Sequence, residues 1–372
     1  MKFTASRETL LKPLQLVAGI VERRQTLPVL SNVLLVLNEQ ELSVTGTDLE
    51  VEIRSQVQLD AAGESGEVTV PARKFVDICR SLPDGAEIKF STEDGRAILR
   101  SGRSRFALST LPANEFPTVE EQSGRMSFTV AQQKLKQLID KTAFAMAQQD
   151  VRYYLNGMLW EVSGNRLRVV ATDGHRLAMS DGDIQVNPNN VGDDKAEQSI
   201  LPRKGVVELA RLLSDEGEVN VVMGTNHARI EGEDFRFTSK LVDGAYPDYE
   251  RVLPKGGTQI LEGERDGLKQ AFQRASILSN EKYRGVRMQL EGDQLTIMAN
   301  NPEQETAEEE ITVSYNGGTL ELGFNVNYII DVLNVLGGDK VRFTLSDANS
   351  SALMDDHHSD DSSVYVIMPM RL

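Results

Sequence analysis

Hydrophobic and polar positions follow two periods along the chain, and the two periods recur in the same order three times. Each third opens on apolar residues spaced three or four apart, as in an amphipathic helix, and continues with the alternation typical of β-strands, before both patterns return. The helical stretches are predicted at 7–24, 72–82, 131–149, 203–213, 265–284 and 325–337. This order predicts an α+β fold in which helices cover one face of antiparallel sheets.

Matched short sequences support an internal repeat. Thr47-Asp48 and Thr172-Asp173 lie 125 positions apart, each beside strand-like sequence. Pro71 and Pro202 lie 131 positions apart, each where the fixed φ of proline suits the start of a helix. Each third closes on a proline, namely Pro117, Pro247 and Pro369. We therefore predict three similar domains of about 124 residues each.

Segments rich in charge, glycine and proline separate the thirds at 118–126 and 251–260, as expected of linkers. We place the three domains at 1–122, 126–252 and 257–372. The last domain closes with VYVIMPMRL, although chain ends are usually frayed and polar unless something holds them. We expect this apolar run to be a repeated strand of the last sheet.

Charge is divided unevenly between these elements. The net charge of −16 and the pI of 4.9, taken alone, argue against binding to phosphates. The six helical stretches, however, hold 18 basic and 8 acidic residues, which leaves 22 of the 40 basic and 48 of the 56 acidic residues to strands and loops. The helical stretches are therefore net positive. A positively charged helical face could contact DNA phosphates without sequence preference and with strong salt dependence. The alternative is that basic residues merely decorate surface helices.

Few residues suggest catalysis or metal binding. Asp173 and His175 in ATDGHR could form the acid and base pair of a hydrolase, but no nucleophile motif accompanies them. The run DDHHSDD at 355–361 has metal-binding residue types, yet such runs are usually solvated loops. The sequence contains no phosphate-binding loop, so we expect no ATP hydrolysis. We expect no cofactor and no metal, and a buried thiol at Cys79.

The sequence also bears on location and on one further class of protein. The start, MKFTASRETLLKPL, carries charges where a signal peptide needs an apolar core, and no run approaches ~18 uninterrupted apolar residues. We therefore expect a cytoplasmic protein that has no contact with a membrane. A sequence-specific repressor remains an alternative, but it would need a recognition helix that reads bases.

A series of short stretches, in order along the whole chain, closely resembles the bacterial DNA polymerase III beta sliding clamp family. Any one of these matches would be weak, whereas their shared order is highly specific. The matching stretches are TGTDLE, VPARKF, RSGRSRF, QDVRYYLNGM, ATDGHRLA, PRKGV, TSKLVDG, PDY, RVLPK, GVR, ANNPEQE, GFNV and YVIMPMRL.

The resemblance implies a processivity factor of DNA replication and not an enzyme. It implies three clamp domains per chain, with helices inside and antiparallel sheets outside, and a head-to-tail homodimer closed into a ring around double-stranded DNA. Six helices ~10 Å wide would leave too small an opening, whereas twelve leave roughly 28 Å for a duplex at least ~16 Å wide. The implied partners are the DNA polymerase III alpha subunit, the clamp loader, and other polymerases and repair proteins that carry clamp-binding motifs.

The resemblance also assigns residues to two surfaces. Lys74, Arg103, Arg105 and Phe106 of one copy would face Ile277, Leu278, Glu303 and Glu305 of the other. Both charged runs could equally be solvated edges, since exposed ion pairs contribute only ~0–1 kcal/mol. The residues implied to contact DNA are Arg24, Arg73, Gln149, Tyr153, Tyr154 and Lys204, although either tyrosine could be a core residue.

In the family, the last strand helps to line an apolar pocket that takes short peptide motifs, and flexible methionines suit such a site. Val366 and Met368 could also be simple core residues. Tyr283, Asn349 and the 355–361 loop depart from the family pattern, which affects the rim of the pocket. The implied pocket residues are Leu155, Thr172, Gly174, His175, Arg176, Leu177, Pro247, Arg251, Val252, Asn325, Tyr328, Ser351, Val366, Met368, Pro369, Met370 and Arg371.

Overall fold

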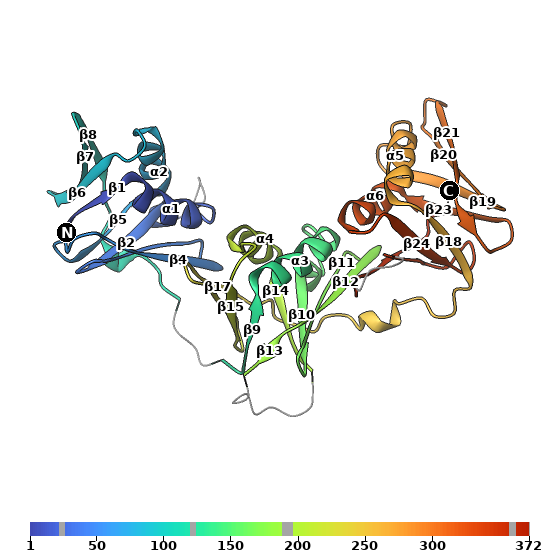
Figure 1. Ribbon diagram of the computed structural model, residues 1–372, viewed down its shortest axis with the longest axis horizontal. Coiled ribbons are helices and arrows are strands. Elements are labelled where there is room, and N and C mark those ends of the chain that lie inside the picture. The colour runs from blue at the N-terminus through green and yellow to red at the C-terminus, as the bar shows by residue number, and fades with distance from the viewer. Residues whose placement is uncertain (22–26, 120–123, 188–195, 357–361, 372) are drawn as a thin grey trace. The chain divides into compact units, whose positions relative to one another are not determined.

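The computed structural model describes residues 1–21, 27–119, 124–187, 196–356 and 362–371 (Figure 1). The chain divides into two compact units. The first comprises Met1–Gln133, Ile184–Asp193 and Lys204–Leu241, and the second comprises Lys134–Asp183, Asp194–Arg203 and Val242–Leu372. The dividing line runs through the middle third of the sequence, so each unit combines one outer third with part of the middle one.

The first unit holds two antiparallel sheets, of order β1-β6-β7-β8 and β13-β9-β15-β16-β17-β4-β3-β2-β5. The strands of the smaller sheet are β1 (Lys2–Ser6), β6 (Glu87–Glu93), β7 (Arg96–Ser101) and β8 (Ser104–Ser109). The strands of the larger sheet are β2 (Asn32–Asn38), β3 (Glu41–Thr47), β4 (Val51–Gln58), β5 (Gly66–Pro71), β9 (Met126–Ala131), β13 (Gln185–Val186), β15 (Glu218–Met223), β16 (His227–Glu231) and β17 (Arg236–Lys240).

Three helices belong wholly or mainly to this unit. α1 (Arg7–Ala18) contacts α2 (Ala72–Ser81) and lies on β3 and β4, where its apolar face is buried. α4 (Arg203–Leu212) has Gly205 close against Ser239 of β17. Short 3-10 turns occur at η1 (Pro28–Ser31) and η2 (Ala113–Glu115). The helices thus cover the sheets as the apolar periodicity predicted, and the predicted burial of Cys79 in α2 is confirmed.

The second unit repeats this design with sheets of order β14-β10-β11-β12-β26-β25-β24-β18-β22 and β21-β20-β19-β23. The strands of the larger sheet are β10 (Gly157–Ser163), β11 (Arg166–Thr172), β12 (Arg176–Asp183), β14 (Glu197–Pro202), β18 (Gln259–Glu264), β22 (Ser314–Tyr315), β24 (Lys340–Leu345), β25 (Ala352–Asp356) and β26 (Val364–Ile367). Those of the smaller sheet are β19 (Gly285–Glu291), β20 (Gln294–Asn300), β21 (Thr306–Thr312) and β23 (Leu320–Asn325).

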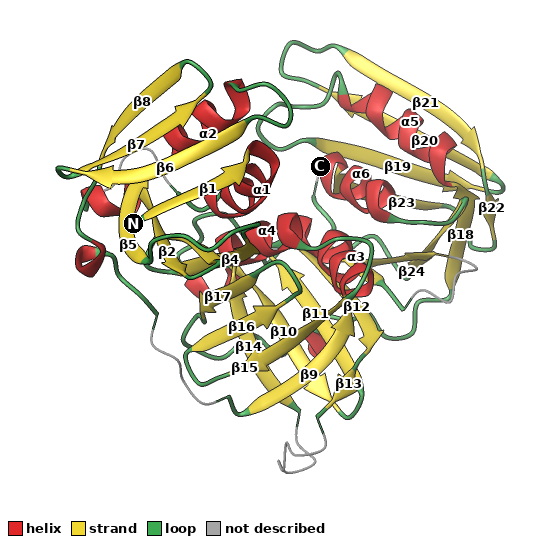
Figure 2. Ribbon diagram, turned by 60° about the vertical axis from the view of Figure 1, so that its left-hand side comes forward, coloured by secondary structure: helices red, strands yellow, loops and turns green. Residues whose placement is uncertain are grey.

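The helices of the second unit are also amphipathic. α5 (Arg265–Ser276) contacts α6 (Val326–Val335) and lies on β20 and β21 (Figure 2). α3 (Gln132–Thr142) starts just before the unit boundary. The 3-10 turns of the second unit are η3 (Ala143–Ala145), η4 (Tyr153–Leu155) and η5 (Tyr249–Arg251). All named strand pairs of both units are antiparallel, which confirms the predicted α+β class.

Three of the helices end six to eight residues earlier than predicted. α1 ends at Ala18 instead of residue 24, although 22–26 lie outside the described residues. α3 ends at Thr142 instead of 149, because the Thr142 hydroxyl donates to the carbonyl of Leu138 and the chain turns into η3. α5 ends at Ser276 instead of 284: the next amides bond three residues back, as Ser279 does to Ser276, and the Asn280 side chain then accepts from two later amides in a turn. Side chains that bind their own backbone compete with the helix.

The repeated Thr-Asp pair builds the same turn in both units. The Thr47 hydroxyl donates to the carbonyl of Val51, and Asp48 accepts from the amides of Glu50 and Val51 at 2.9 and 2.7 Å. Thr172 and Asp173 make the equivalent bonds. Each turn leads into a strand that pairs with the last strand of the next third, β4 with β17 and β12 with β26.

The two turns differ at the residue that needs a left-handed backbone. Gly174 has φ +88° in the second turn, whereas Leu49 has φ +79° at the same place in the first. A side chain in this region costs roughly 1–2 kcal/mol, while glycine costs ~0.4–1 kcal/mol through the entropy of the unfolded chain. The first turn therefore carries strain that the second avoids.

We predict that Leu49→Gly raises the free energy of unfolding by roughly 0.5 kcal/mol, because relief of strain exceeds the entropic cost. Leu27 is similarly exposed but has φ −106°, so Leu27→Gly should lower it by ~0.5–1 kcal/mol. Urea unfolding of the two variants checks this. Destabilisation by both substitutions would contradict the assignment of strain to Leu49.

Candidate functional site

The segment 364–371 is held at both ends by backbone hydrogen bonds of the second unit. Its strand, β26, pairs with β12 on one side and β25 on the other. Beyond the strand, the Met368 amide donates to the carbonyl of His175 at 3.0 Å, and the Met370 amide donates to the carbonyl of Gly323 at 2.7 Å. This confirms that the apolar run is a sheet strand and explains why it is not frayed.

An apolar cluster lies beneath this segment. Leu177 of β12 and Val366 of β26 are register partners and are almost fully buried in it. The remaining buried members are Leu159, Val170, Met179, Ile200, Tyr246 and Tyr249, and the half-buried residues packed on them are Tyr154, Val242, Val252, Leu253 and Val364. Val366 is therefore a core residue of this cluster, whereas Met368 is exposed. Sequence reasoning missed most of the cluster, although its strand alternation was visible.

The other predicted pocket residues belong to the same unit as this cluster. Leu155 is buried in η4, and Pro247, Arg251 and His175 are exposed. The residues of intermediate exposure are Thr172, Gly174, Arg176, Asn325, Tyr328, Ser351, Pro369 and Met370, while Arg371 is exposed. The surface around segment 368–371 thus combines apolar side chains with a few polar ones, as expected of a ligand site.

Arg176 connects three elements beneath the rim. Its guanidinium pairs with Asp173 at 3.1 Å and with Asp331 of α6 at 2.5 Å, and it donates to the carbonyl of Phe144 at 2.8 Å. The same group lies over the ring of Phe144 at 5.2 Å and that of Tyr328 at 4.4 Å. Burial, reinforced by Asp173, raises the pKa of Tyr328 above its ordinary value. Arg176 therefore fixes the turn, η3 and α6 to one another.

The hydrolase alternative loses its support in this turn. Both carboxylate oxygens of Asp173 are occupied, one by the amides of His175 and Arg176 and the other by the Arg176 guanidinium. The equivalent turn at Asp48 has the same bonds but carries Glu50 in place of a histidine. The Thr-Asp motif is therefore explained by backbone structure and not by acid and base chemistry.

Two of the buried members of the cluster, Tyr246 and Tyr249, carry phenol hydroxyls. The Tyr249 hydroxyl donates to Glu161 at 2.8 Å and accepts from Arg168, which also pairs with Asp181 at 2.7 Å. Burial raises the pKa of Tyr249 to about 12, and burial also raises the pKa of Tyr246. Both phenols therefore stay neutral throughout the ordinary pH range.

A groove of about 870 Å³ adjoins the same segment on the β19 to β21 sheet. Met370 and Arg371 form one side of it, and Tyr283, whose ring is largely exposed, stands beside them. The sequence marked Tyr283 only as a departure from the family pattern. Asn349, which also departs from the family pattern, lies in an exposed turn in which its amide donates to Asp347. Of the 355–361 loop, residues 357–361 lie outside the described residues.

The predicted DNA-contacting residues are divided between the two units. Arg73 is exposed on α2, and Lys204 on α4 forms an ion pair with the buried carboxylate of Asp48. Gln149 is exposed, Tyr153 is 58% exposed, and Tyr154 is half-buried against the apolar cluster. Arg24 lies outside the described residues.

The loop before Tyr153 holds a feature that sequence reasoning missed. Arg152 pairs with Asp150 at 2.9 Å, and this contact lowers the pKa of Asp150 to about 2. The intervening Val151 is almost fully exposed. The ion pair between Asp150 and Arg152 therefore leaves the side chain of Val151 exposed to solvent. In the sequence, only the opposite charges on either side of the valine in DVR pointed to this pair.

The two predicted contact surfaces also belong to different units. In the first, Lys74, Arg103 and Arg105 are exposed and Phe106 is half-buried. In the second, Ile277 is 74% exposed, Leu278 is half-buried, and Glu303 and Glu305 are exposed. Glu309, from the same acidic run, instead pairs with Arg274 of its own α5 at 2.6 Å, which lowers the pKa of Glu309.

Other kinds of site find little support in the described part of the chain. No group of three or more His, Cys, Asp or Glu there is placed to hold a metal ion. No helix among these residues has the length and apolar character needed to cross a membrane. Burial raises the pKa of the Cys79 thiol to about 12, so this thiol is a poor nucleophile.

Repeated α+β domains, with apolar side chains beside the strand β26 that joins the last third to the middle one, are typical of a binding protein. Three family models match the chain: the N-terminal domain of the DNA polymerase III beta subunit at residues 1–120, the central domain at 129–248 and the C-terminal domain at 250–371. The Pseudomonas aeruginosa beta sliding clamp is 62% identical, over 100% of both chains.

Solved structures agree. A crystal structure of the DNA polymerase III subunit beta from P. aeruginosa matches with a TM-score of 0.96 at 61% identity, covering 100% of both chains. A second structure of that clamp, bound to griselimycin, matches with the same TM-score, identity and coverage. The chain belongs to the DNA polymerase III beta subunit family, the beta sliding clamps. It is a processivity factor of DNA replication with three clamp domains, and a non-catalytic accessory subunit.

We predict that Arg176→Ala lowers the free energy of unfolding by roughly 2 kcal/mol, because two carboxylates and a carbonyl lose a shared, largely buried partner. Arg251 also pairs with an aspartate three residues away, but its side chain is 86% exposed, so Arg251→Ala should cost only ~0–0.5 kcal/mol. Urea unfolding compares the two variants. Equal losses would show that Arg176 is no more than a surface ion pair.

Proposed function

We propose that two copies of the chain close head to tail into a ring around double-stranded DNA, and that the surface at segment 366–371 tethers the DNA polymerase III alpha subunit to it. The same surface receives the clamp loader and other polymerases and repair proteins that carry clamp-binding motifs. The domains are 1–122, 126–252 and 257–372, and the protein works in the cytoplasm. The griselimycin-bound relative supports a ligand site on this fold.

The observation that carries the ring is a strand pairing that occurs twice within one chain. The strand after each Thr-Asp turn pairs with the last strand of the next third, as in β4 with β17 and β12 with β26. The corresponding strands left over are β21 and β8, and each stands at the edge of its four-stranded sheet. Pairing of β21 with β8 of a second copy would repeat the junction, and because the two surfaces differ, the contact is heterologous. In this proposal the rotation between the two copies closes the ring.

The side chains at these two edges are complementary. β8 and its turn supply Arg103, Arg105 and Phe106, and α2 supplies Lys74. Glu303 and Glu305 precede β21, and Ile277 and Leu278 follow α5. The exposed Ile277 would be the apolar centre of the contact, where most of the binding free energy is usually found.

DNA contacts in this proposal come from charge and not from base reading. Arg24, Arg73 and Lys204 would meet phosphates, and Gln149, Tyr153 and Tyr154 would contact phosphate or sugar. The exposure of Arg73, Gln149 and Tyr153 supports this assignment. Such contacts are weak, salt-dependent and independent of sequence, which permits movement along the duplex.

The partner site would use Leu177, Val252 and Val366 as its apolar floor and Met368 and Met370 as adaptable walls. His175, Arg176 and the other predicted pocket residues would form its polar margin. Because the partners would bind the same residues, they would compete for this site.

The first experiment tests the ring. The chain, labelled with a fluorescent dye and loaded on closed circular DNA by the clamp loader, should remain bound during gel filtration. It should be released once the circle is cut. Ile277→Lys should abolish retention and sediment as the 41.2 kDa monomer, because a buried positive charge would face the basic edge of the partner copy. Val207→Lys, at another exposed apolar position, on α4, should remain a dimer. Equal loss from closed and cut circles would refute encirclement.

The second experiment tests the partner site. Deletion of residues 368–372 should abolish stimulation of the polymerase while the sedimenting species stays a dimer, because the walls of the site are removed without loss of β26. Deletion of 371–372 alone, which keeps both methionines, should leave most of the stimulation. Unchanged stimulation by the longer deletion would refute the assignment.

A further inference from the structure

The groove of about 870 Å³ beside Met370 runs across the smaller sheet of the second unit. Strand register aligns one residue from each of its four strands in a row: Gly323 of β23, Arg287 of β19, Met298 of β20 and Glu308 of β21. The Met370 amide donates to the carbonyl of Gly323, so segment 366–371 meets this row at its β23 end. The groove therefore continues from the proposed partner site to the edge strand β21.

Missing side chains help to explain why this face is hollow. Gly285 of β19 lies two positions before Arg287 and so on the same face of the sheet. Gly323 of β23 is the register partner of Arg287, and neither glycine has a side chain to fill the space beside Tyr283. The remaining wall of the groove is rich in amides, from Asn280, Asn300 and Asn301.

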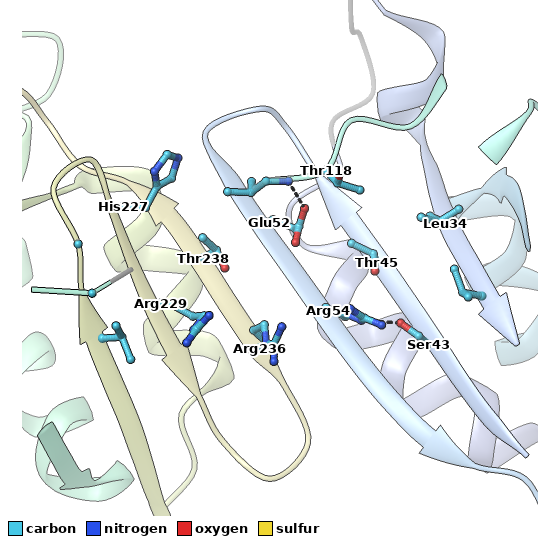
Figure 3. Close-up of a pocket in the computed structure, with 15 residues that line it drawn as sticks. Leu34, Ser43, Thr45, Glu52, Arg54, Thr118, His227, Arg229, Arg236 and Thr238 are labelled. Carbon is cyan, nitrogen blue, oxygen red and sulfur yellow. Dashed lines mark hydrogen bonds between the residues drawn. The ribbon is translucent and has the colours of Figure 1, made fainter. Parts of the chain in front are cut away.

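The same face has a different chemistry in each third of the chain. The turn at Asn301, whose side chain accepts from the Glu305 amide at 2.9 Å, corresponds to the Thr-Asp turns and aligns the strands. In the second third this face belongs to the apolar cluster, whereas in the first third it is largely polar (Figure 3). The corresponding residues of the first, second and third thirds are Leu34, Leu159 and Arg287; Thr45, Val170 and Met298; Glu52, Leu177 and Thr306; and Arg54, Met179 and Glu308.

The charged residues of the row do not neutralise each other. Arg287 pairs with Glu321 of β23 at 3.2 Å, and β23 lies on the side of β19 away from β21. Glu309 points to the opposite face of β21 and pairs with Arg274 of α5. Glu308 is exposed, and no cation among the described residues pairs with it. The β21 end of the groove thus offers a carboxylate beside the side chain of Met298.

An arginine or lysine side chain matches this pair of groups. Its aliphatic stem can cover Met298 while its charged end bonds to the carboxylate of Glu308, which would repel an acidic side chain. Four neighbouring strands span three spacings of ~4.8 Å, or about 14 Å, which an extended chain covers in about four residues of ~3.3 Å each. A residue about four positions from a chain held at Met370 therefore reaches Glu308.

We propose that this groove binds the part of a partner chain that adjoins its clamp-binding motif, and that it selects a basic side chain about four residues from that motif. The proposal rests on the proposed function, because the motif must first be held at segment 366–371. A partner that carries the basic residue would have an advantage over one that lacks it when both compete for the site.

The test measures the anisotropy of fluorescein-labelled peptides that share the apolar core Leu-Leu-Leu-Phe. One pair has Arg or Gln before the core, as Arg-Ser-Ser-Ser-Leu-Leu-Leu-Phe and its Gln match. The other pair has it after the core, as Leu-Leu-Leu-Phe-Ser-Ser-Ser-Arg and its Gln match. In one of the two pairs the Arg peptide should bind the full chain about fivefold more tightly than the Gln peptide, the upper range for an exposed ion pair.

Two variants locate the source of this difference. Glu308→Gln should abolish it, because the carboxylate that meets the basic side chain is lost. Glu310→Gln removes an exposed carboxylate two positions further along the same face of β21, and it should preserve the difference.

Three results would overturn the proposal while the proposed function stands. The first is equal affinity of the Arg and Gln peptides in both pairs. The second is an equal loss in Glu308→Gln and Glu310→Gln, which would mean attraction to the acidic edge as a whole. The third is sedimentation of Glu308→Gln as a monomer, which would assign the carboxylate to the contact between copies.

Failure of the proposed function gives a different result. Either no peptide with the apolar core would bind the full chain, or deletion of residues 368–372 would leave the affinity of both Gln peptides unchanged. Each of these two results would overturn both proposals, because the core would then not be held at segment 366–371.

Discussion

The structure depends on edge-to-edge pairing of antiparallel strands. An open sheet leaves a row of unpaired amides and carbonyls at its edge, and these groups need partners. In each unit the strand that follows a Thr-Asp turn meets the last strand of the next third, so two domains share one continuous nine-stranded sheet. β8 and β21 each stand at the edge of a four-stranded sheet, and the contact proposed between two copies would meet the same requirement there.

The turn before each joining strand explains why the pairing is repeated. Threonine and aspartate side chains satisfy the backbone groups of the turn and set the start of β4 and of β12. In the second unit Arg176 adds ion pairs to Asp173 and Asp331 and a hydrogen bond to η3. A guanidinium with five donors can join three elements in this way, which a lysine could not.

The two junctions share a backbone but differ in chemistry. At the second, apolar side chains from β11, β12 and β26 form a buried floor beside flexible methionines. At the first, threonine, glutamate and arginine occupy the same register positions, and the face is charged. Duplication of a scaffold therefore conserves hydrogen-bond geometry while its outward-facing side chains are free to change, because alternate residues of a strand point to opposite faces.

The sequence by itself determined the α+β class, the threefold repeat, the strand at 364–367 and the buried Cys79, because apolar periodicity and repeated turn residues are local signals. It overextended α3 and α5, because apolar residues continue beyond Thr142 and Ser276, where the chain enters η3 and the turn at Asn280. The tertiary structure alone decided which side chains of ATDGHR are committed to the turn, that Val366 lies in the core while Met368 is exposed, and that Glu309 pairs with its own helix. It also placed Arg54 of β4 directly opposite Arg236 of β17 as register partners. These facts depend on strand register between distant segments, and register is set by pairing that no single stretch of sequence contains.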